Sequence, residues 1–427
     1  MRRKLIRVAA ATVAAGVFAG GVHVPGPARA VAPGVVLLAA GQRPYEEVTR
    51  DLHSPDPAVR VAAMRALAVA SYPESMAPIA TLLTDQRDDI QLEAIDTLLS
   101  FVVVDRFTTT RRVALVVEVK DKQRPEAVFD AGPFVLIPRP VVPEVVTGLA
   151  AAMRDDSERV RVDATYALGV LARPGVDAAG IQALVTAMGD PEKKVRLAAV
   201  RVAGALRAEG AGDAIINAIN DKQPEVRTAA MRAIGDVRDE RAVPALTEQF
   251  EFYERKGPYA EAAFDGLARI GSARSTPVFQ EQLTSRSRLM RRYAAEGLAR
   301  SGQASLSRPT LESCVGAEKE QDVALACAYA LQSVGRPAVD RLVAALSQRS
   351  LAPVAMLYLT ELGPPVAGPL GAYLQSPDAA TREAVAMVLG VVGGADAIAA
   401  LDRAKQDPDT DVARAVERAI ARARMGR

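Results

Sequence analysis

Histidine and cysteine, which supply most catalytic bases, nucleophiles and metal ligands, are nearly absent from this chain of 427 residues. The two histidines are His23 and His53, and the two cysteines are Cys314 and Cys327. A Ser-His-Asp or Cys-His site would have to be built around His53, whose place beside Ser54 is typical of a turn. So few ligands cannot form a zinc site, and the sequence contains no glycine-rich phosphate-binding motif. We therefore expect no enzymatic activity, no metal and no cofactor.

Carboxylates are abundant, but their spacing points to helix starts. Asp-Pro pairs occur at 56–57, 190–191 and 407–408. An aspartate caps free amides at a helix start, and proline fits the first helical position because an N–H there has no helical acceptor. The acidic run at 407–411 is superficially like a calcium loop, but it lacks the glycine and the bidentate glutamate of an EF-hand. We expect this run and the one at 155–158 to cap helices.

These acids belong to a motif that recurs along the chain: an acidic turn, a Val-Arg pair, then small residues at helical spacing. Its small central position falls at Ala63, Ala94, Ala164, Ala199, Ala230, Ala263, Ala295, Cys327, Met356, Val385 and Val416. One interval is 70 residues and the others are 29–35, which is room for two helices of about a dozen residues and two turns. Only 4% of the residues are aromatic and none is Trp, so the core must consist of Ala, Val and Leu. Each repeat is expected to be a helical hairpin.

The motif resembles the HEAT-repeat family, especially its short form, the phycobilin-lyase-type HEAT repeat, from about Tyr45 to the C-terminus. The resemblance implies an all-α fold, a right-handed, armadillo-like α-solenoid (superhelix) of about eleven HEAT-like hairpins. It also implies a ladder in which motif arginines bind turn acids of neighbouring repeats. The matching positions are Arg60, Arg161, Arg196, Arg227, Arg382, Asp156, Asp190 and Asp221. The pattern decays at Ala263, Cys327 and Met356, and the alternative role for the arginines is a row of cations that binds an acidic partner.

The two cysteines flank the expected turn of one hairpin, near residues 317–320. Cys314 lies about four residues before that turn and Cys327 about nine after it, which offsets them by roughly 7 Å along the helix axes. Such an offset exceeds comfortable disulfide geometry. We therefore expect two buried thiols.

The N-terminus has the order of a secretory signal peptide. Basic residues up to Arg7 precede an almost wholly apolar stretch from Val8 to Val24, and residues 28–30 fit an A-x-A cleavage site. Cleavage after Ala30 would remove residues 1–30 and leave a linker at 31–44 on an exported, periplasmic or extracellular protein with no transmembrane domain. The alternatives are an uncleaved membrane anchor and, from the Arg-Arg start, a twin-arginine signal. No cysteine lies near the cleavage site to carry a lipid anchor.

Removal of the signal peptide would leave 48 basic and 51 acidic residues, a net charge near −3. A nucleic-acid partner requires a clustered positive surface. We therefore expect a protein partner and no nucleic acid.

The interval of 70 residues separates HEAT-like repeats at 45–101 from those at 142–427 by an insertion at 102–141. Residues 112–120 are rich in β-branched side chains, 121–125 indicate a turn and 134–137 are apolar again, which predicts a β-hairpin or extended excursion. Aromatic and arginine residues are typical of interface hot spots. The candidate partner-binding residues are Phe107, Arg111, Arg112, Phe129 and Phe134. Alternatively these aromatics seal the insertion onto the solenoid, and a second aromatic cluster at 250–259 is expected to pack in the core.

The sequence thus favours an exported scaffold or adaptor that binds another protein through the concave solenoid face, the insertion, or both. The resemblance also implies an alternative, a lyase-type HEAT enzyme or accessory that acts on a bound chromophore or small ligand. A third possibility is an envelope structural protein held by an uncleaved signal.

Overall fold

The computed structural model describes residues 44–103, 110–114, 117–120, 124–172 and 175–425. The signal peptide expected at 1–30 and all but the last residue of the linker expected at 31–44 lie outside these residues. The chain divides into a leading unit, Met1–Tyr45, and a compact unit, Glu46–Arg427. The helical hairpins make up the compact unit.

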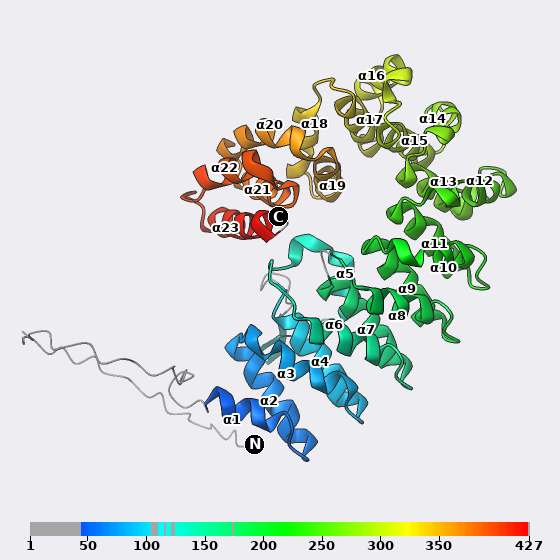
Figure 1. Cartoon of the computed structure of the whole chain (residues 1–427). Helices are drawn as coiled ribbons and strands as arrows, with labels where there is room; N and C mark the ends of the chain where they lie inside the picture. The colour runs from blue at the N-terminus through cyan, green and yellow to red at the C-terminus, as the bar shows by residue number, and fades with distance from the viewer. Residues whose placement is uncertain (1–43, 104–109, 115–116, 121–123, 173–174, 426–427) are drawn as a thin grey trace, which may run out of the picture. The chain divides into compact units, whose positions relative to one another are not determined.

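Within the described residues the fold is all-α apart from one two-stranded sheet, and its helices form eleven consecutive hairpins (Figure 1). The second helices of the hairpins pack against one another in chain order. We call them the motif row: α2 (Pro57–Ala70), α4 (Asp88–Ser100), α7 (Glu158–Leu171), α9 (Lys193–Ala205), α11 (Pro224–Val237), α13 (Gly257–Ile270), α15 (Arg288–Arg300), α17 (Gln321–Ser333), α19 (Ala352–Leu362), α21 (Ala379–Val392) and α23 (Thr410–Met425). The first helices are α1 (Tyr45–Asp51), α3 (Met76–Ala80), α6 (Pro143–Ala152), α8 (Ala178–Ala187), α10 (Gly212–Ala218), α12 (Val243–Phe252), α14 (Thr276–Gln282), α16 (Arg308–Ala317), α18 (Val339–Ala344), α20 (Ala367–Ala372) and α22 (Gly394–Arg403). None of these helices has both the length and the apolar character that crossing a bilayer requires.

Local sequence explains where the motif helices begin and how closely they pack. Asp56 accepts the N–H of Ala58 at the start of α2, and Pro57 occupies the first helical position. Inside the row, small residues bring neighbouring backbones together: a Cβ on Gly204 of α9 would lie 2.7 Å from the Cα of Ala233 in α11. A larger side chain at such a position would force the helices apart, so the core is made of small aliphatic residues.

The insertion leaves the motif row after α4 and returns before α6. It contains an antiparallel pair, β1 (Thr110–Ala114) and β2 (Val117–Lys120), in which Thr110 faces Lys120, followed by helix α5 (Pro125–Ala131). A β-hairpin was expected in the insertion, and both paired strands lie before the turn expected at 121–125. Residues 121–123 of that turn lie outside the described residues, and Pro125 begins α5. The helix was not anticipated; its start has proline at the first position and Glu126 in the first turn, both of which favour a helix N-terminus.

The two ends of the insertion are joined to each other. Val103 forms an isolated antiparallel bridge with Leu136, and the Ile137 N–H donates to the Val102 carbonyl at 2.6 Å. Because the insertion closes on itself, α4 packs directly against α7. The stacking of hairpins therefore continues past it.

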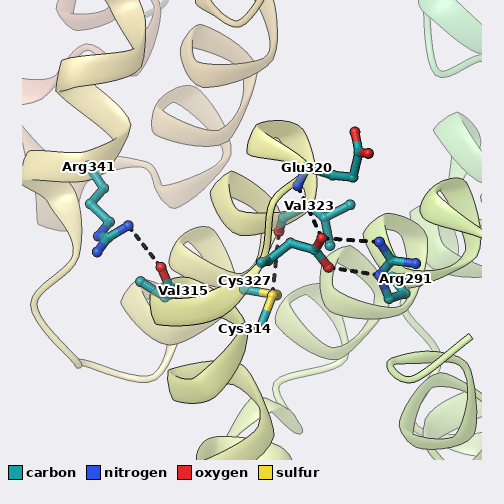
Figure 2. The surroundings of a disulfide bond; sticks show 8 residues. Arg291, Cys314, Val315, Glu320, Val323, Cys327 and Arg341 are labelled. Carbon is teal, nitrogen blue, oxygen red and sulfur yellow. Dashed lines mark hydrogen bonds and ion pairs between the residues drawn. A yellow bond between two sulfur atoms is a disulfide. The ribbon is translucent and has the colours of Figure 1, made fainter.

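The expectation of two buried thiols is wrong: Cys314 and Cys327 form a disulfide, with Cα atoms 6.3 Å apart (Figure 2). Cys314 lies three residues before the end of α16, and Cys327 lies six residues after the start of α17. Their axial offset is therefore about 4.5 Å at 1.5 Å per residue. The extended backbone at Glu318 and Glu320 gives the connecting turn the length that brings the two cysteines level with each other. The sequence estimate failed because it gave the connecting turn no length of its own.

We expect the double variant Cys314→Ser with Cys327→Ala to unfold more easily than the wild type, by about 2–3 kcal/mol, because the bond closes a short loop in the unfolded chain. Denaturant unfolding followed by circular dichroism measures the difference. Without reductant, the unfolded wild type should react with no thiol reagent. Reaction at two thiols, together with unchanged stability of the variant, would show that the bond is absent.

Candidate functional site

Salt bridges between consecutive turns run along the motif row. The motif arginine typically binds, through Nε and Nη2, the carboxylate in the turn before the next motif helix, and its Nη1 donates to carbonyl oxygens of its own turn. The same carboxylate accepts the N–H two residues further on, which fixes the turn. The pairs are Arg60–Asp85, Arg161–Asp190, Arg196–Asp221, Arg291–Glu318 and Arg382–Asp407, with N–O distances of 2.8–3.1 Å. We call this set the ladder.

Several residues have places that differ from the sequence expectation. Asp190 and Asp221 are ladder acids as expected, whereas Asp407, expected only as a helix cap, is also a ladder acid and closes its turn. The Asp156 carboxylate is not part of the ladder, and only the backbone carbonyl of Asp156 accepts from Arg161; the Asp155 carboxylate takes the expected place of Asp156.

We call the place of the motif arginine in each motif helix the motif position. The ladder acid always lies six residues before the next motif position, as Asp85 does before Gln91 and Asp155 before Arg161. This spacing is a signal that the sequence reading overlooked.

One motif arginine departs from the arginine–acid pattern, and another follows the pattern but was not predicted from the sequence. Arg227 donates to the carbonyls of its own turn, but its outward partner is the Tyr259 hydroxyl at 3.3 Å, and its guanidinium lies 5.1 Å from that ring. Arg291 was missed because Met rather than Val precedes it. Figure 2 shows its contact toward the turn beside the disulfide, where Glu318 binds it at 2.8 Å.

We call each contact of the ladder a rung. The rung that joins the hairpins on either side of the insertion has a neutral residue in place of the arginine. Gln91 of α4 stands at the motif position, and its Nε2 donates to Asp155 Oδ2 at 2.7 Å, although 64 residues separate the two. Asp155 in turn accepts the Ser157 N–H at 2.9 Å. The contact has the geometry of the other rungs without the positive charge.

Helix α5 holds the second half of the insertion on the motif row. Phe129 is buried against Tyr166 of α7, with ring centroids 5.4 Å apart, and the Arg201 guanidinium lies 5.5 Å from the Phe129 ring. Arg201 donates to the Tyr166 hydroxyl at 2.9 Å, to Glu126 at 3.0 Å and to Asp130. Burial raises the pKa of Tyr166, so its hydroxyl stays protonated and donates to Glu126.

The five candidate partner-binding residues are thus not equivalent. Phe107 and the side chains of Arg111 and Arg112 lie outside the described part of the chain. Phe129 packs inside the protein, as in the sealing alternative, and Phe134 is half-buried.

The return segment of the insertion lines a cleft of about 550 Å³ with the ends of α7, α9, α21 and α23. Its lining is mostly apolar and includes the three guanidinium groups of Arg139, Arg207 and Arg422, but no carboxylate among the described residues. Arg422 donates to the carbonyl oxygens of Pro133 and Leu136 at 3.0 and 2.6 Å. Burial, together with the neighbouring positive charge of Arg418, lowers the pKa of Arg422. The cleft suits an apolar group that carries a negative charge.

The aromatic cluster at 250–259 is divided between core and surface. Phe250 is fully buried and stacks on Phe264 at 4.8 Å, as expected. Phe252, in contrast, is 73% exposed and meets Tyr253 edge to face, and Tyr253 stacks on Tyr259 at 4.8 Å. We call Phe252, Tyr253 and Tyr259 the aromatic patch. It is a second surface with the composition of an interface.

The densest set of buried titratable groups lies between α15, α17 and α19. Arg300 binds Glu361 at 2.9 Å and Glu296 at 3.2 Å, the Tyr329 hydroxyl donates to Glu361 at 2.7 Å, and the Tyr358 hydroxyl donates to Glu296. Burial raises the pKa of both tyrosines, so they remain donors. These buried groups satisfy one another, which is the arrangement of a structural network.

The comparison with protein families agrees with this architecture. Residues 181–251 match the family model described as HEAT repeats. HEAT repeats are therefore identified at these residues. No curated protein sequence matches the chain.

The solved structures that are similar to this chain are distant in sequence. The complex of CpcE and CpcF of phycocyanin lyase from Nostoc sp. PCC7120 shares 20% identity at a TM-score of 0.40, over 58% of this chain and 96% of that one. An engineered protein shares 17% identity at a TM-score of 0.33, over 89% of this chain and 98% of that one. A chain from a study of the interaction between cadherin and beta-catenin shares 13% identity at a TM-score of 0.36, over 89% and 94% of the two chains. Nothing about function follows from similarities this low.

The ladder of the HEAT repeats gives a pH-dependent prediction. Burial raises the pKa of Asp221, but hydrogen bonds from Arg196 and from the Gln223 N–H lower it more, so the net pKa lies below its ordinary value. A depressed pKa adds stability that is present above about pH 4 and lost as the pH falls. We expect Arg196→Gln to cost about 3 kcal/mol at pH 7, since it leaves a buried carboxylate without its partner. The difference from wild type in the free energy of unfolding should shrink below about pH 4.

The matched control is Asp213→Asn, which removes a surface contact: Asp213 lies 2.8 Å from Arg241, and its side chain is 83% exposed. This variant should unfold as the wild type does at every pH. A cost for Arg196→Gln that equals the control at pH 7, or that does not change with pH, would contradict the role of the ladder.

Proposed function

We propose that this HEAT-repeat protein is an exported, non-enzymatic scaffold or adaptor that binds another protein, with the insertion at 102–141 as its main recognition element. The observation that carries the proposal is that hairpin stacking is complete without the insertion. Gln91 reaches Asp155 directly across it, and α4 packs on α7. An element that the stacking does not require is available for binding, and insertions in solenoids often emerge on the binding face.

The cleft beside the insertion indicates the chemistry of the partner. Its apolar lining and its three arginines, with no carboxylate among the described lining residues, fit an apolar segment that carries a carboxylate. The motif row is less available for such a contact, because its ladder arginines are used between hairpins: the Arg196 side chain is only 6% exposed. The insertion is therefore a better site than the ladder.

Two independent features support export. The first thirty residues have the pattern of a signal peptide. The Cys314–Cys327 disulfide fits an oxidising compartment, where such bonds persist.

The N-terminus of the protein purified from the producing cells tests export directly. We expect intact-mass spectrometry to show a chain that begins at Val31, because Ala28 and Ala30 form the cleavage site. A chain that retains residues 1–30 and is found in the membrane fraction would support the anchored alternative instead.

Replacement of residues 105–122 by a short Gly-Ser linker tests the insertion while it leaves α5 and Phe129 in place. We expect this variant, immobilised beside the mature wild type, to lose at least about 90% of the specifically captured exported partner. The physical reason is that truncating interface hot spots costs more than about 1 kcal/mol each. Quantitative mass spectrometry of the captured proteins measures the loss, and unchanged helicity by circular dichroism shows that the hairpins are intact.

The matched control is Phe252→Ser in the aromatic patch, which should capture the partner as the wild type does. Loss of binding in the control with retention in the insertion variant would move the site to the aromatic patch. Equal binding by all three proteins would leave the cleft or the motif row as the contact surface and overturn the role of residues 105–122 in recognition.

A further inference from the structure

The ladder lacks one positive charge. Gln91 stands where a motif arginine stands in five other rungs, and its amide brings a hydrogen bond to Asp155 but no charge. Asp155 supplies the carboxylate of this rung and accepts hydrogen bonds from the Gln91 amide and from the Ser157 N–H. The rung that joins the two sides of the insertion is therefore negatively charged.

Two further carboxylates gather at this rung. Asp88, the first residue of α4, and Asp156 each place a carboxylate oxygen within 4.8 Å of the others and of Asp155. None of the three makes a salt bridge within the described residues. The nearest arginines are engaged elsewhere: Arg87 binds Asp89, and Arg161 binds Asp190 and the backbone carbonyls of Asp155 and Asp156. Three carboxylates held together without a cation repel one another.

The Gln91 side chain supplies a second, independent indication of a ligand. The residue is only 2% exposed, its amide ends at the Asp155 carboxylate, and its Oε1 is buried without a hydrogen-bond partner. No protein group in the described part of the chain contacts this oxygen through a hydrogen bond, so the orientation of the amide depends on the contact with Asp155 alone. The oxygen and nitrogen of a glutamine amide exchange places by a half-turn about the last side-chain bond. That rotation would put an oxygen ligand at the carboxylates in place of the N–H.

We propose that Asp88, Asp155, Asp156 and the Gln91 amide oxygen form a calcium site, in which the ion supplies the positive charge of the missing ladder arginine. Calcium takes six to eight oxygen ligands at about 2.4 Å, so two of its ligands can be at most about 4.8 Å apart. The three carboxylates meet this limit. Magnesium, with ligands at about 2.1 Å and strict octahedral geometry, fits less well. Water completes the shell, because Asp88 and Asp156 are exposed.

The proposed calcium site lies between two hairpins, so a bound ion would have a structural role. Asp88 belongs to the hairpin before the insertion, and Asp155 and Asp156 to the turn after it. A bound ion clamps these two hairpins at the point where the insertion leaves the motif row. An open site of this kind matches extracellular calcium concentrations, with a Kd of about 10⁻⁴–10⁻³ M. The inference departs from the expectation of no metal, and it does not depend on the proposed partner.

The test compares the thermal unfolding of the purified protein in EDTA, in 10 mM CaCl₂ and in 10 mM MgCl₂ at equal ionic strength, with equilibrium dialysis to count bound calcium. We expect calcium to raise the Tm by a few degrees, magnesium to raise it clearly less, and one calcium ion to bind per chain. Asp156→Asn should lose the bound ion and the calcium-dependent rise. Asp213→Asn, an exposed acid far from the site in sequence, should keep both.

Gln91→Arg is the decisive variant, because it rebuilds the ladder pair with Asp155. It should raise the Tm in EDTA toward the calcium-bound value of the wild type and abolish the response to calcium. If Gln91→Arg does not fold, Asp88→Asn serves in its place and should lose the calcium response. An equal response of wild type, Asp156→Asn and Asp213→Asn, an equal effect of magnesium, or no bound calcium in the wild type would overturn the site.

Discussion

The guanidinium of a motif arginine lies where two hairpins meet, and the rest of the structure depends on that contact. A single hairpin cannot bury its apolar face alone, so each one needs its neighbours in register. The arginine sets this register, because it binds its own turn through backbone carbonyls and the next turn through a carboxylate. In Arg196 the side chain is almost completely enclosed, so a loss of either partner would leave a buried charge. Small residues such as Gly204 then allow the helices to approach as closely as the ladder requires.

Where the arginine–acid pair is missing, a different interaction takes its place. Arg227 uses the hydroxyl and the ring of Tyr259. The hairpin that contains Cys327 has no motif arginine to bind the turn of the next hairpin, and a disulfide joins its two helices. Further on, Arg300 and Glu361 connect α15 to α19 through a buried network. Gln91 is the case with a hydrogen bond but no charge, which is why three carboxylates beside it call for an ion.

The contact between Gln91 and Asp155 connects the stability of the stack with the proposed function of the insertion. The chain departs from the motif row after Gln91 and returns before Asp155, yet these two residues touch. The insertion is therefore an addition to a finished stack, held by Phe129 and α5 at one side. Its return segment forms an apolar, arginine-lined cleft. Binding through an added element leaves the ladder undisturbed, so recognition and repeat stacking can be separated by mutation.

The sequence by itself determined the repeat, the all-α class and most of the ladder, because these follow from local spacing. A period near 32 residues defines hairpins, and before any folding is considered an acid stands six residues ahead of Gln91, Arg161, Arg196 and Arg227. Tertiary structure alone decided three things. The Cys314–Cys327 bond depends on the length and backbone of the turn between two helices. The burial of Phe129, rather than its exposure to a partner, depends on how α5 docks on α7. The contact of Gln91 with Asp155 joins residues 64 positions apart. Asp88 lies near Gln91 on α4 and Asp156 lies next to Asp155 in the sequence, but only the stacking of hairpins across the insertion brings the two pairs together.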